Sequence, residues 1–119
     1  MPKPRKKQMI YEDNRLYVCL ANFPITKGHL IVAWKKRVTD LSLLDKKDYQ
    51  YLMGIVDRTR NALIKSLKVK KVYLIYMDEI NQVHWHLVPR YDEKGFNMLN
   101  HSPKKLKDFG LVETIKKTL

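Results

Sequence analysis

The sequence predicts a single α+β domain whose sheet is mostly antiparallel and has about five strands. The chain has 119 residues, of which 45% are apolar, and this is enough to fill one hydrophobic core. Short segments rich in β-forming residues come before and after one long segment with helical periodicity, and a short helical pattern closes the chain. Strands, a helix, further strands and a last helix in a chain of this size are typical of the α+β class.

Three strands are expected before the long helix, over residues 7–12, 15–22 and 29–34. The first two are joined by Asp13 and Asn14, a turn-forming pair, so they predict an opening hairpin. Pro24 and Gly28 bracket the loop that follows. The third segment is rich in apolar β-forming residues and predicts a well-buried strand.

A long amphipathic helix is predicted from Asp45 to about residue 67. Its apolar side chains share one face at a period of 3.6 residues: Tyr49, Leu52, Met53, Val56, Leu63, Ile64 and Leu67. The carboxylate of Asp45 can cap the first turn, and Asp48 places negative charge where the helix dipole favours it.

Two further strands are expected after this helix, over residues 71–77 and 83–88. The polar pair Asp78 and Glu79 interrupts them, and Pro89 follows the second. A short C-terminal helix is predicted between residues 102 and 119, where apolar side chains recur at helical spacing: Leu111, Val112, Ile115 and Leu119.

The composition excludes several classes of protein. The longest uncharged apolar stretch, residues 16–25, is about half of the ~20 residues that cross a bilayer, so no membrane-spanning segment is expected. The basic N-terminus is not followed by the apolar region of a secretory signal. The single cysteine, Cys19, excludes an intramolecular disulfide and a cysteine-based zinc site, and it fits a reducing compartment. We therefore expect a cytoplasmic protein.

Basic residues are in large excess, with 24 Lys and Arg against 12 Asp and Glu and a formal net charge of +12. Because several of them lie at the start of the chain, we divide it into a basic tail, residues 1–7, and one domain, residues 8–119. The remaining cations occur largely as doublets, which are typical of solvated surface. The excess still predicts attraction to phosphate groups, either on a nucleotide or on a nucleic acid.

His84 and His86 are the most informative residues of the chain. They lie two apart in a predicted strand, so they share one face, together with Gln82. The opposite face is apolar: Val83, Trp85 and Leu87. Two neighbouring imidazoles are costly to bury unless solvent, a metal or an anion meets them. The pair therefore predicts an anion-binding site.

Such a pair fits three kinds of chemistry, which the two residues alone do not separate. A zinc site needs a third and usually a fourth ligand, which His29 or His101 would have to supply. Acid–base catalysis at a phosphate needs only two imidazoles with pKa values near ~6.5, one neutral and one charged. A nucleophilic imidazole would instead attack phosphorus and hold a covalent intermediate.

Residues 82–90, Gln-Val-His-Trp-His-Leu-Val-Pro-Arg, resemble the signature of the histidine-triad (HIT) superfamily of nucleotide hydrolases and transferases, His-φ-His-φ-His-φ-φ with φ apolar. Residues 27–32, Lys-Gly-His-Leu-Ile-Val, resemble the second marker of that family, a Gly-His or Thr-His pair that opens a central strand. The resemblance covers residues 11–91, with the long helix between the two markers. The tryptophan in the signature and the short loop before it are similar to the diadenosine-polyphosphate hydrolases of the family.

The resemblance implies a HIT-like fold and a set of site residues. His84 matches the family's nucleophile, which attacks the α-phosphate of a nucleoside phosphate derivative, such as a dinucleoside polyphosphate or an adenylyl amidate. The resulting nucleotidyl-histidine is resolved by water, and a nucleoside monophosphate is released. His86 and His29 would support the phosphate as charge develops on it. The nucleophile requires no metal, so Mg²⁺ would enter only with a polyphosphate substrate, and a homodimer is implied.

The sequence departs from the family pattern at three places. Gln82 replaces the first histidine, and because an amide forms hydrogen bonds but does not titrate, we expect phosphate support with altered leaving-group chemistry. Residues 78–81 replace a phosphate-contacting loop, and their two acidic residues predict a loop that turns away or holds a cation. Ala21 stands where the family has its ribose contact, so Asn22 is the candidate nucleoside-binding residue; alternatively, it only forms the turn before Pro24.

The leading hypothesis is therefore a HIT-type nucleotide hydrolase or transferase acting through His84. One alternative is a catalytically weak nucleotide- or nucleic-acid-binding module, in which Gln82 marks lost activity and the basic surface binds RNA or DNA. A third hypothesis, an enzyme that removes adenylate from nucleic-acid ends, would use both the histidines and the charge.

Overall fold

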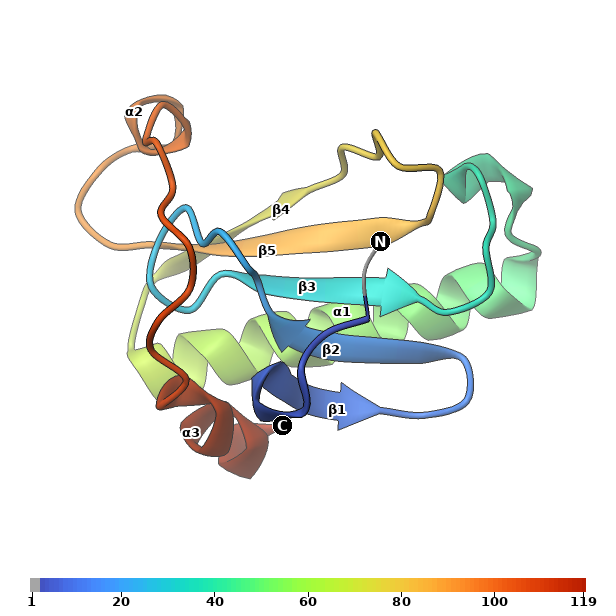
Figure 1. The fold of residues 1–119 in the computed structure, drawn as a ribbon, viewed down its shortest axis with the longest axis horizontal. Coiled ribbons are helices and arrows are strands. Elements are labelled where there is room, and N and C mark those ends of the chain that lie inside the picture. The colour runs from blue at the N-terminus through green and yellow to red at the C-terminus, as the bar shows by residue number, and fades with distance from the viewer. Residues whose placement is uncertain (1–2) are drawn as a thin grey trace.

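The structure, a computed structural model that describes residues 3–119, is one five-stranded sheet with a long helix packed along one side (Figure 1). The strands are β1 (Met9–Glu12), β2 (Leu16–Leu20), β3 (Leu30–Trp34), β4 (Lys71–Ile75) and β5 (His84–Arg90). Their order across the sheet is β1-β2-β3-β5-β4, and every neighbouring pair is antiparallel. The predicted α+β class with about five antiparallel strands is confirmed.

The long helix α1 (Lys46–Leu67) begins and ends where the sequence predicted. The carboxylate of Asp45 accepts a hydrogen bond from the backbone N–H of Asp48 at 2.8 Å, and Lys68, in the left-handed conformation with φ 56°, terminates the last turn. Its buried side chains form one stripe: Leu52, Ile55, Val56, Thr59, Ala62 and Leu63. Tyr49 was predicted to belong to the packed face but is 41% exposed, since the first turns of α1 extend past the end of β3 (Figure 1).

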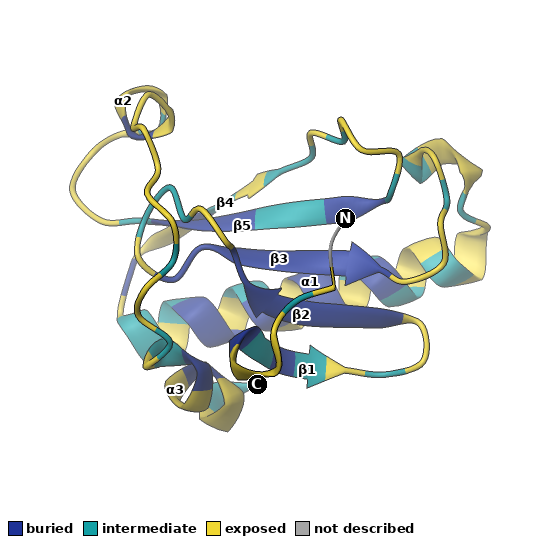
Figure 2. Cartoon of the chain, viewed as in Figure 1, coloured by how far each residue is buried: buried dark blue, intermediate teal, exposed yellow. Residues whose placement is uncertain are grey.

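The sheet separates two buried clusters. The larger one joins the helix side of the strands to α1 and to the C-terminal helix α3 (Leu111–Thr118). The smaller one lies on the opposite face, which we call the front side because it faces the reader in Figure 1; it comprises Tyr17, Cys19, Ala21, Ile31 and Ala33. Figure 2 shows that β2 and β3 are buried along their whole length, whereas β4 at the sheet edge is only partly buried.

Several short elements were not predicted. They are the 3-10 helices η1 (Lys6–Gln8) and η2 (Leu41–Leu43) and the single-turn helix α2 (Gly95–Leu99). Each is too short to show a hydrophobic period. β5 also continues through Pro89, which pairs with Val72, whereas the sequence predicted an end before the proline. The C-terminal helix spans only the last part of the predicted region, residues 102–119, because residues 102–109 are not helical.

The predicted basic tail is partly built into the domain. Residues 1–2 lie outside the described residues, while Lys6 and Lys7 form η1 with Gln8. The side-chain amide of Gln8 is buried and donates a hydrogen bond to the carbonyl of Leu20 at 2.9 Å, which ties this turn to the end of β2. Within residues 3–119, no helix has the length and apolar character that a bilayer span requires.

Gly28 allows a close approach of the backbone at the start of β3. Its φ is +90°, and an added Cβ would lie 2.6 Å from Cδ1 of Leu67 and 3.4 Å from Cγ of Pro89. Residues with a side chain rarely adopt this φ. The glycine of the Gly-His pair is therefore required by the backbone and by helix packing, next to the histidine of the site.

Replacing this glycine should destabilise the fold. We expect Gly28→Ala to lower the free energy of unfolding by about 1–3 kcal/mol, because it adds both strain and overlap. Gly54→Ala is the matched control: Gly54 lies within α1 with nothing within 4 Å of an added Cβ, so this change should stabilise by about 0.5–1 kcal/mol. Urea denaturation of the two variants measures both effects, and equal stability of Gly28→Ala and wild type would contradict the prediction.

Candidate functional site

Three histidines form a row on the front side of the sheet. His84 and His86 point the same way from β5, with ring centroids 5.0 Å apart, and the register sets them opposite Ala33 and Ile31 of β3. His29, immediately before β3, reaches the same side, and its ring centroid lies 5.2 Å from that of His86. The structure thus brings together the three histidines that the sequence singled out, and it places His29 against His86.

The ring of His84 is held in one tautomer by the backbone. Its Nδ1 lies 2.8 Å from the carbonyl oxygen of Gln82. Because a carbonyl oxygen can only accept, the proton of a neutral His84 ring must lie on Nδ1. Nε2 then carries a free lone pair, which is the state that a nucleophile requires.

His29 and His86 are linked by a directed chain of hydrogen bonds. The backbone N–H of Ile25 donates to Nδ1 of His29 at 3.0 Å, so the proton of His29 lies on Nε2. That N–H faces Nδ1 of His86 at 3.0 Å and donates to it. The proton of His86 consequently lies on its Nε2, where it can be donated to a bound anion.

Both supporting rings are neutral at physiological pH. Burial, with a contribution from the charge of His86, lowers the pKa of His29 to about 3. Burial, with a contribution from the charge of His84, lowers the pKa of His86 to about 4. These rings therefore act as hydrogen-bond donors and acceptors and carry no charge in the resting protein.

The loop before β5 orients His84. Oδ1 of Asp78 accepts hydrogen bonds from the backbone N–H groups of Ile80 at 3.0 Å and Gln82 at 3.2 Å. The carboxylate thereby fixes the residue whose carbonyl holds His84. This positioning role was missed in the sequence, from which the acidic loop was expected only to turn away or to hold a cation. The spacing from Asp78 to a backbone N–H two residues later is the signal of an Asx turn that could have revealed it.

The side chain of Gln82 points toward β3. Its Nε2 donates a hydrogen bond to the carbonyl of Trp34 at 2.9 Å. It also lines a hollow of about 290 Å³ on the front side, together with Lys3, Pro4, Met9, Glu12, Tyr17 and Lys35. The first triad position is therefore occupied by a group that bridges β5 and β3, next to open space.

Asn22, the candidate nucleoside contact, lies on the exposed loop after β2. Its Oδ1 accepts a hydrogen bond from Nε2 of Gln8 at 2.9 Å, and its carbonyl accepts one from the N–H of Leu106 at 2.6 Å. The residue thus connects three segments of the chain. Contact with a nucleoside stays a prediction.

The front-side floor beside the histidines is apolar and includes Cys19. Burial raises the pKa of this thiol to about 12, so it stays protonated and unreactive. Next to His84 lies the small side chain of Ala33, and next to that lies Tyr17 of β2. The small side chain of Ala33 leaves space directly beside the ring of His84.

Metal-binding geometry is not found among residues 3–119, in which no group of three or more His, Cys, Asp or Glu side chains could hold an ion. The hydrogen bonds of the histidine row explain why its rings do not form such a group. Nδ1 of His84 and both ring nitrogens of His29 already have partners. Their lone pairs therefore do not converge on one point.

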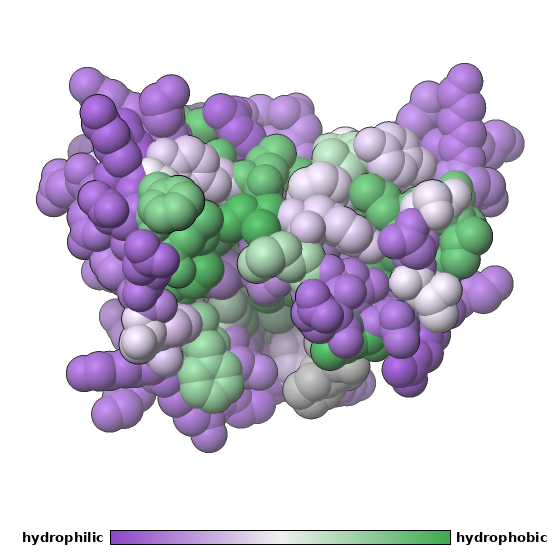
Figure 3. Space-filling model, turned by 90° about the horizontal axis from the view of Figure 1, so that it is seen from above, coloured by the Kyte–Doolittle hydropathy of each residue, from purple (hydrophilic) through white to green (hydrophobic). Residues whose placement is uncertain are grey.

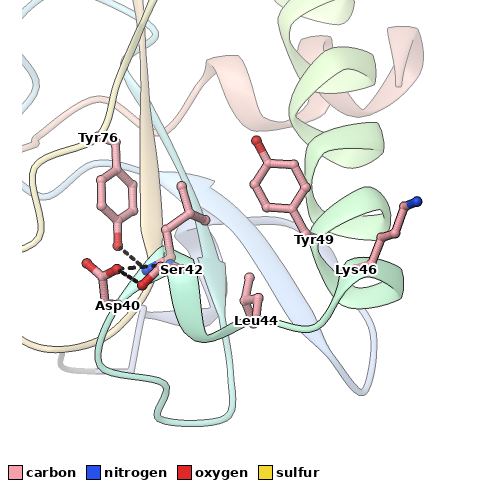
Figure 4. A pocket seen from close by; sticks show the side chains of 7 residues that line it. Asp40, Ser42, Leu44, Lys46, Tyr49 and Tyr76 are labelled. Carbon is pink, nitrogen blue, oxygen red and sulfur yellow. Dashed lines mark hydrogen bonds between the residues drawn. The ribbon is translucent and has the colours of Figure 1, made fainter.

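A second hollow, of about 580 Å³, lies between η2, the first turn of α1 and Tyr76 (Figure 4). Two of its polar side chains form hydrogen bonds within the loop: Oη of Tyr76 accepts from the N–H of Leu41 at 3.1 Å, and Asp40 accepts from the N–H of Ser42 at 2.9 Å. None of the three histidines lines it, so it lies apart from the chemistry of the row.

Comparison with known proteins identifies the family. A family model described as the HIT domain matches residues 3–93. The chain belongs to the HIT domain family. An uncharacterized HIT-like protein of Borreliella burgdorferi is 26% identical over 86% of this chain and 83% of its own length. Another of Mycoplasma genitalium is 30% identical over 73% of this chain and 67% of its own length.

Solved HIT structures share the fold. A hypothetical histidine triad nucleotide-binding protein of Sulfolobus tokodaii has a TM-score of 0.77 at 19% identity and covers 93% of this chain and 82% of its own. A diadenosine triphosphate hydrolase of Plasmodium falciparum, in complex with cyclomarin A, has a TM-score of 0.71 at 12% identity. The match covers 96% of this chain and 72% of that protein. At these identities the likeness establishes the fold alone. The family resemblance is confirmed, and the diadenosine-polyphosphate subgroup stays a prediction.

The neutral histidines of this HIT domain predict a loss of stability in acid. Between about pH 6.5 and pH 4, His29 and His86 are protonated in the unfolded chain but stay neutral in the folded protein. The free energy of unfolding should therefore fall with pH, by up to about 1.4 kcal/mol per pH unit for each ring. Urea denaturation at several pH values should show a smaller slope for His29→Gln than for wild type. Identical slopes in the two proteins would contradict the assignment.

Proposed function

We propose that this HIT protein is a nucleotide hydrolase or transferase that cleaves nucleoside phosphate derivatives at the α-phosphate through a nucleotidyl-histidine on His84. The single observation that carries the proposal is the hydrogen bond from Nδ1 of His84 to the carbonyl of Gln82 at 2.8 Å. In the neutral ring this bond places the proton on Nδ1 and leaves Nε2 unprotonated, and an imidazole held this way is ready to attack phosphorus. The family and its anhydride-cleaving structural neighbour support the reaction class.

Two displacements complete the proposed reaction. First, the lone pair on Nε2 of His84 forms a bond to the α-phosphorus, and the bond to the leaving group breaks, with the electron pair going to the leaving group. The Nδ1 proton stays in its bond to the Gln82 carbonyl. Next, a water oxygen attacks the phosphorus, the P–N bond returns its electrons to Nε2, and one proton is released to solvent. A nucleoside monophosphate results, and an acceptor other than water would make the same step a transfer.

The remaining polar groups would support the phosphate. Nε2–H of His86 can donate to a phosphoryl oxygen, because its other nitrogen is occupied by His29. His29 acts as a positioning residue that fixes this tautomer. The nucleophile requires no metal, and we expect any Mg²⁺ dependence to come through the phosphates of a polyphosphate substrate.

We further propose that two copies assemble through the β4 edge. This edge strand and the chain after it expose large apolar side chains: Leu74 (40%), Met77 (57%) and Ile80 (39%). Figure 3, which looks onto the face with the β4 edge, shows apolar surface in its centre. An apolar edge strand is typical of a surface that another chain covers. The cytoplasm stays the expected compartment, since nucleotides are found there and Cys19 is a free thiol.

Loss of the nucleophile should abolish turnover. We expect His84→Ala to reduce AMP release from diadenosine tetraphosphate and from an adenylyl amidate on the order of 10³-fold or more. Rapid quenching should trap an adenylated protein in wild type and none in the variant. His101→Ala, which removes an exposed histidine, is the control. Equal turnover by His84→Ala and wild type would refute the proposal.

The same experiment separates the alternatives. Absence of turnover in wild type, together with tight and salt-sensitive oligonucleotide binding, would instead favour a nucleic-acid-binding module. An adenylated DNA end, used as a third substrate, tests removal of adenylate from nucleic acid.

Gln82 should set the preference for leaving groups. A phosphate leaves as an anion, whereas an amine needs a proton that an amide side chain cannot deliver. We expect Gln82→His to raise amidate hydrolysis roughly tenfold relative to anhydride hydrolysis. Gln82→Met, which also loses the bond to Trp34 but adds no acid, is the control. A similar ratio of the two rates in both variants would show that proton donation is not involved.

A further inference from the structure

Two hydroxyl groups tie the loop between β2 and β3 to the end of β5, which it crosses in Figure 1. Oγ1 of Thr26 donates a hydrogen bond to the carbonyl of Pro89 at 2.6 Å. Oη of Tyr91, the residue after β5, donates to the carbonyl of Lys27, also at 2.6 Å. One bond runs from the loop to the strand and the other runs back. We call this pair of hydrogen bonds the hydroxyl clip.

The clip begins where the pairing of the sheet ends. The ladder between β3 and β5 stops at Leu30 and Leu87, so Pro89 lies beyond it. Pro89 is buried, and a buried carbonyl needs a hydrogen-bond donor. The hydroxyl of Thr26 supplies the donor that β3 no longer provides. The loop is thereby attached to β5 three residues beyond His86.

The same loop holds the ring of His29. The backbone N–H of Ile25 donates to Nδ1 of His29 at 3.0 Å, and the backbone N–H of His29 donates to the carbonyl of Thr26 at 3.1 Å. Thr26 is therefore bonded to His29 through its carbonyl and to β5 through its hydroxyl. The place of the Ile25 N–H relative to β5 depends on this attachment.

These contacts form a closed circuit of hydrogen bonds. It runs along β5 from His86 to Pro89, crosses the clip to Thr26, and returns through His29, whose Nε2 lies 3.0 Å from Nδ1 of His86. In a closed circuit a shift at one bond must be matched at the others, so the rings are held more firmly than in an open chain.

We propose that Thr26 and Tyr91 are positioning residues of the reaction, because the hydroxyl clip keeps His29 in the orientation that directs the Nε2 proton of His86 toward the substrate phosphate. This inference rests on the proposed function and adds two residues that act through the backbone of the loop. They support the hydrogen-bond donor of the site, whereas Gln82 and Asp78 hold the nucleophile.

Movement of the loop would reverse the direction of the relay. Without the N–H of Ile25, the proton of His29 is free to move from Nε2 to Nδ1. Nε2 of His29 would then accept a hydrogen bond from Nδ1 of His86. His86 would present the lone pair of its Nε2 to the phosphate in place of a proton, and a lone pair does not stabilise an anion.

A third contact from the segment after β5 is weaker. Nδ1 of His101 lies 3.5 Å from the carbonyl of Ile25, while its Nε2 is held by Glu93 at 2.9 Å. A distance of 3.5 Å is at the limit for a hydrogen bond. The two hydroxyl contacts of 2.6 Å therefore carry the attachment of the loop.

Removal of each hydroxyl tests the clip. Thr26→Val and Tyr91→Phe each remove one of its bonds, and Thr26→Ser keeps the hydroxyl. Thr59→Val is the matched control, since the hydroxyl of Thr59 donates to the carbonyl of Ile55 at 2.7 Å within α1. Nitrogen NMR of the imidazole rings reports which ring nitrogen is protonated. Wild type, Thr26→Ser and Thr59→Val should carry the His86 proton on Nε2. In Thr26→Val and Tyr91→Phe its signals should shift toward the Nδ1 tautomer.

Kinetics connect the tautomer with catalysis. Because His86 supports charge that develops in the transition state, loss of its directed proton should lower kcat more than it raises KM. For diadenosine tetraphosphate we expect kcat to fall about tenfold in Thr26→Val, with KM within about twofold, and Thr26→Ser to restore most of the rate. Thr59→Val should leave both constants within about twofold. Thermal melts verify folding, and Tyr91→Phe tests the clip at a residue that is 41% exposed.

Three results would overturn the inference. They are an unchanged His86 tautomer in Thr26→Val and Tyr91→Phe, an equal change in Thr59→Val, and an altered tautomer without any change in kcat. The second would show that the tautomer follows global stability, and the third that the clip does not act on the reaction. A tautomer that depends on the clip in a wild-type protein without turnover would support the clip and refute the proposed function, so the two failures are distinguishable.

Discussion

The antiparallel pairing of β3 with β5 is the constraint on which the site depends. It sets Ile31 opposite His86, so that His29, two residues earlier on the same side of β3, comes diagonally against the ring of His86. Both strands are central in the sheet, and packing against α1 leaves them little freedom to shift. A slip of one residue would move both histidines of β5 to the helix side. Gly28 sustains this arrangement, since it lets the chain enter β3 close to α1.

The three packed imidazoles are tolerated because the hydrogen bonds between them are directed. The N–H of Ile25 donates to His29, His29 donates to His86, and His84 donates to a carbonyl, which leaves Nε2–H of His86 for a ligand. An unpaired polar group in this setting would cost several kcal/mol, so the pairing rigidifies the row. His29 and His86 contribute hydrogen-bonding groups to the row without placing charge in the sheet.

The acidic loop before β5 shows how a feature unfavourable to phosphate can serve the site. Asp78 directs its Oδ1 at backbone N–H groups, one of them that of Gln82, and Gln82 in turn holds both His84 and the end of β3. The carboxylate of Asp78 therefore stabilises the turn. In this protein the loop at this position therefore orients His84.

The sequence by itself determined the features that depend on local periodicity. A period of two placed His84 and His86 on one face, a period of 3.6 defined α1, and Asp45 marked its first residue; all of these are confirmed, because neighbouring residues alone decide them. The short elements and the passage of β5 through Pro89 were beyond such patterns, since tertiary contacts hold them.

Only the tertiary structure decided how distant residues meet. The hydrogen bond between His29 and His86, which fixes the tautomer of His86, joins residues 57 positions apart, and no spacing rule encodes it. The grouping of the basic residues is likewise decided by the tertiary structure. In the sequence, Lys27 and the lysines of residues 104–107 are far apart and read as solvated surface, but folding places them around one cavity beside His29. Long-range packing sets hydrogen-bond partners and charge neighbours, whereas local sequence sets only the direction in which each side chain points.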